Sequence, residues 1–158
     1  MFQTRSLILL LLLASSLISC RYGFVPEGTE GGKKIALDPS TNKTHLREAG
    51  IVLDSFLEQS FASMGMISNK DPKYRLTCSM VSSSRERITS ISLKSGDRYR
   101  LTVSVLAKLS DASGKALWQA TFSDTGNFSE GGQDEDALDE ACRQVSLQIA
   151  RAVAVLQL

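Results

Sequence analysis

The chain has 158 residues, of which 18 are basic and 17 acidic, so its formal net charge is +1 at pH 7. This balance gives no general attraction to nucleic acid, and we expect no nucleic-acid partner. The length suits one domain that buries roughly two-thirds of its surface on folding.

The first twenty residues are typical of a bacterial secretion signal. An apolar run from Leu7 to Ile18 follows Arg5, and it is shorter than the about 20 apolar residues that cross a bilayer as a helix. The run ends in Leu17-Ile18-Ser19-Cys20, which resembles the lipobox of bacterial lipoproteins. We predict a signal peptide over residues 1–19 and lipidation of Cys20, the alternative being an ordinary signal peptide with a chance cysteine.

Several acyl chains on one protein make its release from a membrane negligible. Arg21 follows the cysteine, at a position where aspartate would resemble an inner-membrane retention signal, so we expect an outer-membrane lipoprotein on the periplasmic side. Residues 20–32 are rich in glycine and are typical of a flexible tether. We assign residues 33–158 to a single domain.

The first half of this domain predicts a strand, a helix and a strand. Residues 34–38 favour a short strand that Pro39 ends, and Thr44 is a candidate cap for the helix. Residues 74–80 alternate between apolar and polar, as in a half-buried strand. The helix between them is predicted to end at Gly65, and apolar residues at three- and four-residue steps define it. These are Leu46, Ala49, Leu53, Phe56, Leu57, Phe61 and Met64.

The middle of the domain predicts an antiparallel hairpin. Residues 85–93 favour a weaker strand or a loop. Residues 99–109 alternate most regularly and predict the central strand of the sheet. Residues 111–114 (Asp-Ala-Ser-Gly) then form a turn into a strand over residues 116–122. We expect residues 126–132 to be a flexible break.

The last element is a predicted helix over residues 138–156, with acidic residues 134–136 complementing its dipole. Leu147 points away from its apolar face, as an exposed leucine or a partner contact. Cys78 and Cys142 fall on predicted core faces, so two buried thiols are favoured over a disulfide.

The order β-α-β-β-β-α predicts an α+β fold, a small mixed sheet of about four strands with two helices packed on one face. The first strand, helix and second strand can form a right-handed crossover, followed by an antiparallel meander. The other face of the sheet stays open to solvent or to a partner.

The sequence offers no catalytic or metal site. His45 is the only histidine, and it falls in a predicted loop without a second ligand nearby. A serine or cysteine nucleophile would need it as base, and no Gly-x-Ser-x-Gly elbow is present. The acidic residues between 130 and 140 are explained by the helix start. We expect no enzyme activity, no metal and no cofactor.

Basic residues crowd the middle of the chain, with only Glu86 and Asp97 as local counter-charges. They are Arg85, Arg87, Lys94, Arg98 and Arg100. Guanidinium groups bind phosphate in a bidentate manner, and Arg98 and Arg100 share the outward face of the predicted central strand. The default explanation is a basic strand edge that prevents aggregation, and anion binding is the functional alternative.

Three short motifs carry a family resemblance. They are Cys20-Arg21-Tyr22-Gly23-Phe24 before the tether, Ile35 to Leu37 followed by Asn42-Lys43-Thr44, and Gly114-Lys115-Ala116-Leu117-Trp118. The chain resembles the LptE family of lipopolysaccharide-assembly lipoproteins, although Arg21 replaces the usual glycine.

The resemblance implies a plug-like partner of the outer-membrane translocon barrel LptD, which helps the barrel assemble and receive lipopolysaccharide without catalysing a reaction. The lipopolysaccharide contacts of the family are basic, but no motif fixes their counterparts here, so Arg85, Arg87, Arg98 and Arg100 are candidates from the cluster alone. The alternatives are a regulator of a cell-wall synthase, a pilot of a secretin, or a lipid or cell-wall hydrolase.

Overall fold

The computed structural model describes residues 33–88, 98–129 and 134–158. The predicted signal peptide, Cys20, the tether and Lys94 lie outside these ranges. The elements are β1 (Ile35–Leu37), β2 (Thr41–Asn42), α2 (Ala49–Ser63), β3 (Tyr74–Ile88), β4 (Arg98–Asp111), β5 (Ala116–Ser129) and α3 (Asp134–Val155).

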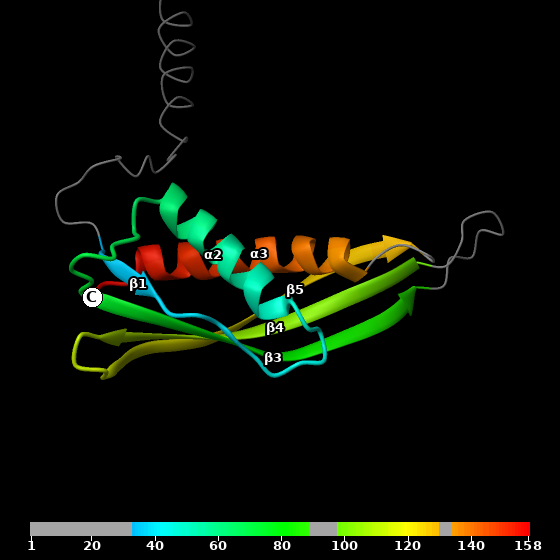
Figure 1. Cartoon of the computed structure of the whole chain (residues 1–158), viewed down its shortest axis with the longest axis horizontal. Coiled ribbons are helices and arrows are strands. Elements are labelled where there is room, and N and C mark those ends of the chain that lie inside the picture. Colours follow the sequence, from blue (N-terminus) through cyan, green and yellow to red (C-terminus); the bar gives the residue numbers. More distant parts are fainter. Residues whose placement is uncertain (1–32, 89–97, 130–133) are drawn as a thin grey trace, which may run out of the picture.

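One mixed sheet forms the base of the domain. Its strand order is β1-β3-β4-β5, with β2 also paired to β3. β1 and β2 run parallel to β3, whereas β3, β4 and β5 are antiparallel. Both helices cover the same face of the sheet and leave the other face open (Figure 1). The predicted α+β fold, the hairpin and the central position of residues 99–109 are therefore confirmed.

The sheet has five strands rather than about four. The additional strand, β2, contains only Thr41 and Asn42, which pair with Ser79 and Met80. Two residues are too few for the side-chain alternation that reveals a strand in a sequence.

The core lies between the sheet and the helices. β4 contributes alternate residues, from Leu101 to Leu109, that are at most 1% exposed. This alternation is the consequence of the two-residue period of a strand with one wet face. α2 contributes Leu53, Leu57 and Phe61, and α3 contributes residues on the apolar arc that the sequence predicts. Leu147 of α3 is half-buried rather than exposed.

β3 is longer than the sequence predicts. It continues through the serine-rich stretch to Ile88, with a register shift against β4 between Met80 and Ser82. Pairing with β4 satisfies the main chain there, so the strand persists although its side-chain pattern is weak.

The flexible break predicted from Gly126 is wrong for residues 126–129, which belong to β5. A Cβ atom on Gly126 would lie 1.9 Å from the main-chain oxygen of Ala137 in α3. The glycine therefore serves the close approach of helix to strand, a known use of glycine within strands. Residues 130–133 lie outside the described ranges.

Thr44 does not cap α2, which begins at Ala49 without a side-chain cap. The Asn42 side-chain oxygen accepts hydrogen bonds from the Thr44 main-chain N–H and hydroxyl, both at 2.8 Å. The Thr44 hydroxyl in turn accepts a bond from the Leu46 N–H at 3.3 Å. The Asn-x-Thr motif thus forms an Asx turn that directs the chain into the helix.

Lys33 joins the start of the domain to the end of α3. Its ammonium group donates to the carbonyl oxygens of Val153 (2.8 Å) and Ala154 (2.6 Å). A cation here satisfies the last carbonyls and complements the helix dipole. Partial burial lowers the pKa of Lys33. None of the helices in the described ranges is long and apolar enough to span a membrane.

Candidate functional site

The open face of the sheet carries the candidate site. Residues opposite one another in an antiparallel pair share a face, so the register assigns each side chain of β3, β4 and β5 to one side. The open side is rich in hydroxyl groups, and Ser104 and Ser123 hydrogen-bond across β4 and β5 at 2.8 Å. The hydroxyl residues of this side include Thr77, Ser79, Ser82, Ser84, Thr102, Ser104, Thr121, Ser123 and Thr125.

Arg98 and Arg100 lie at one end of this face, and both are exposed. Arg100 is opposite Glu86 on β3 and Asn127 on β5. Glu86 therefore offsets part of the local positive charge. The two guanidinium groups stand next to a hydroxyl-bearing surface, an arrangement that suits a ligand with phosphate and hydroxyl groups.

Arg85 and Arg87 do not join them. They lie opposite Leu101 and Tyr99, on the helix side of the sheet. If strict alternation continued from Met80, both arginines would share the open face with Arg98 and Arg100. The bulge at residues 80–82 inverts this assignment, because an extra residue in a strand moves every following side chain to the other face.

Arg85 has a packing role that the sequence does not reveal. Its guanidinium carbon lies 4.5 Å and 4.7 Å from the ring centroids of Tyr99 and Phe128, which stack on each other at 5.3 Å. Arg85 also pairs with Asp134 at 3.3 Å. This arginine of β3 thus contacts β4, β5 and the start of α3. Its distances to the two rings are those of a cation–π interaction. Only the strand register could have indicated it.

The explanation by edge protection is wrong for Arg98 and Arg100, since β4 lies between β3 and β5. It remains available for Arg85 and Arg87, because β3 pairs only with β4 beyond Met80 in the described residues. His45 is exposed. Within residues 33–88, 98–129 and 134–158, no group of histidine, cysteine and acidic side chains could hold a metal ion.

Cys78 and Cys142 are free, buried thiols, as the sequence favours. Burial, together with a smaller effect of the nearby charge of Asp54 on Cys78 and of Asp139 on Cys142, raises the pKa of each thiol from 9.0 to about 12. Because only the thiolate reacts readily with disulfide reagents, both groups should be inert in the folded protein.

We expect a disulfide reagent at pH 8 to leave Cys78 and Cys142 unmodified until the chain unfolds. Because folding raises the pKa of both thiols, their neutral forms stabilise the folded state, and this contribution to the free energy of unfolding is fully present below the ordinary pKa of 9.0. This contribution is lost as the pH rises toward about 12, so the unfolding temperature should fall over that range. Mass mapping of labelled cysteines checks the first result, and modification of either thiol before unfolding would contradict it.

A comparison with known protein families identifies the family of this chain. The sequence model of LptE, described as lipopolysaccharide-assembly, matches residues 32–153. The chain belongs to the LptE family. Two of the three motifs that resemble the family lie in the described residues, where Ile35–Leu37 is β1 and Gly114, with φ +86°, turns the chain from β4 into β5. Among curated proteins, no sequence matches this LptE-family chain.

Solved structures share the fold at low sequence identity. The PelC dodecamer of Paraburkholderia phytofirmans is 19% identical, with a TM-score of 0.55 over 80% of this chain and 89% of that one. A minor lipoprotein of Acinetobacter baumannii is 15% identical, with a TM-score of 0.53 over 77% and 92%. A protein of Xanthomonas campestris is 14% identical, with a TM-score of 0.59 over 82% and 88%.

Proposed function

We propose that this chain is a non-enzymatic subunit of the lipopolysaccharide translocon, held at the periplasmic side of the outer membrane by lipid on Cys20. The observation that carries the proposal is the LptE-family match over residues 32–153. The lipobox-like sequence before Cys20 supports the anchor. A lipoprotein of Acinetobacter baumannii with a similar fold is consistent with it.

In this role the chain sits in the lumen of an LptD-like β-barrel and assists its assembly. The open face of the sheet supports the proposal, because its hydroxyl rows can form hydrogen bonds with the polar, water-lined inner wall of a large barrel. The helices on the opposite face close the core, so contact with the wall requires no unfolding.

Arg98 and Arg100 are the proposed lipopolysaccharide contacts. Their guanidinium groups suit the phosphates of the lipid, and the neighbouring hydroxyls suit its sugars. We leave Arg85 out of this proposal, since its guanidinium group stacks on Tyr99 and Phe128 and pairs with Asp134.

The double substitution Arg98→Glu/Arg100→Glu should weaken lipopolysaccharide binding at least tenfold. A charge-assisted hydrogen bond contributes about 1.5–3 kcal/mol, and 1.4 kcal/mol corresponds to tenfold in affinity. Binding of labelled lipopolysaccharide to the full chain in detergent measures the effect.

The matched control is Arg47→Glu/Arg151→Glu, which makes the same charge change at exposed residues of the helix-containing side. It should bind lipopolysaccharide within about twofold of the unsubstituted chain. Equal losses in both variants would indicate attraction by net charge and would contradict a site at Arg98 and Arg100.

A further inference from the structure

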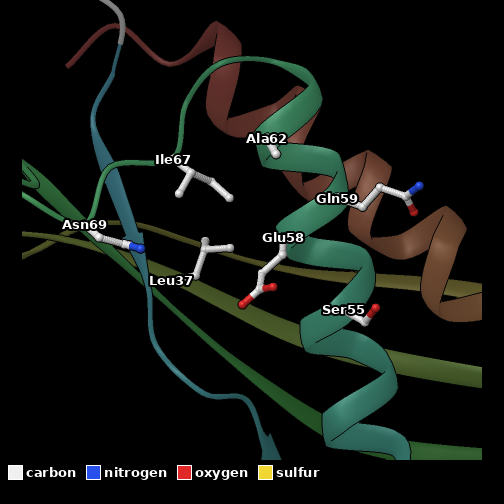
Figure 2. A pocket seen from close by; sticks show the side chains of 7 residues that line it. All are labelled: Leu37, Ser55, Glu58, Gln59, Ala62, Ile67 and Asn69. Carbon is white, nitrogen blue, oxygen red and sulfur yellow. The ribbon is translucent and has the colours of Figure 1, made fainter.

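A groove runs beside α2 on the helix side of the sheet, where the helix faces the edge strand β1 (Figure 2). The volume of this open groove is about 490 Å³. The side chains of Leu37 and Ile67 point toward the helix, and Glu58 points from the helix toward Leu37. A hollow of about 90 Å³ shares Leu37 and Glu58 with this groove and reaches Asp38 and Asp54. The groove therefore has two lobes, the larger hollow and the smaller one, which adjoin at Leu37.

The main chain of Leu37 faces this groove. The Asp38 N–H bonds inward to Leu76 of β3, and Ile35 bonds outward to segment 66–68 through both its N–H and its carbonyl. Successive residues of a strand direct these groups to opposite sides, so those of Leu37 point outward like those of Ile35. In the described part of the chain, no hydrogen bond joins the Leu37 main chain to the neighbouring segment. A short stretch of sheet edge is thus open to pairing.

The groove is negatively charged. Glu58 is exposed and forms no ion pair within the described residues, and the Asp54 carboxylate accepts only an uncharged N–H, from Ser40. Asp38 is already paired with Arg75. Neither lobe is lined by a lysine or arginine, and α2 contains none. Among residues 33–88, 98–129 and 134–158, the two acidic groups of the helix therefore have no cationic partner.

We propose that this groove binds an extended peptide segment of a partner protein, with a lysine or arginine next to an apolar residue. The Leu37 main chain pairs with the segment, as in the addition of a strand to a sheet edge. The apolar side chain packs on Leu37 and Ile67, and the cation lies against Glu58. From Ser55 to Ala62 the helix rises about 10 Å, the length of about three extended residues.

The charge of the groove favours a partner over the chain's own tether. Residues 20–32 contain one basic residue, Arg21, against Glu27 and Glu30, so their net charge is negative like that of the groove. The proposal is independent of the lipopolysaccharide role, because the groove lies on the helix side and Arg98 and Arg100 lie on the open face.

The test is an NMR titration of the isotope-labelled full chain in detergent with the peptide acetyl-Val-Lys-Val-Lys-Val-amide. We expect shifts of the Leu37 amide and of segments 55–62 and 67–69. Glu58→Gln should raise the dissociation constant at least fivefold. Glu48→Gln makes the same charge change just before α2, outside the groove, and should stay within twofold.

Three results would overturn the proposal. One is the absence of shifts in these segments at millimolar peptide. Another is equal binding of a peptide with glutamate in place of both lysines. The third is movement of the same amides when the protein concentration alone is raised, which would identify a second copy as the occupant. Lipopolysaccharide binding by Arg98 and Arg100 is measured separately and does not depend on any of them.

Discussion

Gly126→Ala is expected to lower the free energy of unfolding by about 3 kcal/mol, the upper part of the usual range for an overpacked site. The new Cβ would lie 1.9 Å from the Ala137 oxygen and 2.6 Å from its Cα. These are main-chain atoms of α3, so the helix itself would have to move. Denaturant unfolding measures the change.

Gly114→Ala is the matched comparison. Gly114 has a φ of +86° but has nothing within 4 Å of a new Cβ. It should lose about 1–2 kcal/mol from backbone strain alone. If Gly126→Ala lost less than Gly114→Ala, the close contact between β5 and α3 would be contradicted.

Phe61→Ala should lower the free energy of unfolding by about 4 kcal/mol, because truncating a buried phenylalanine removes its apolar contacts and leaves a cavity. Phe61 is 0% exposed and belongs to the cluster that joins α2 to the sheet. Ile51→Ala on the same helix is the control, since Ile51 is 74% exposed. It should change stability by about 0.5 kcal/mol or less. Similar losses in both variants would contradict the packing of α2.

The regular elements could be predicted because their period is long and uninterrupted. The alternation of residues 99–109 indicated β4, and the apolar arc of residues 138–156 indicated α3. Their order then limited the fold to an α+β arrangement with helices on one face. β2 could not be predicted in this way, because it has only two residues. Glycine is typical of a break in regular structure, so the sequence predicts a break at Gly126 although this residue lies in β5.

Only part of the candidate site could be predicted, because the face on which each side chain of β3 lies depends on the pairing register of that strand. The outward positions of Arg98 and Arg100 follow from β4 alone. The separation of Arg85 and Arg87 from them depends on the bulge after Met80, which no local signal marks. The groove beside Leu37 arises from the tertiary placement of α2 next to a three-residue strand, so the periodicity of the sequence does not indicate it.

The proposed function depends on which protein this LptE-family chain binds in the membrane. The most direct measurement is to solubilise membranes that contain the tagged full chain in detergent and to identify by mass spectrometry what stays bound. We predict a large outer-membrane barrel of the lipopolysaccharide-export type, at close to one copy per chain. A secretin or a cell-wall synthase in its place would contradict the translocon role.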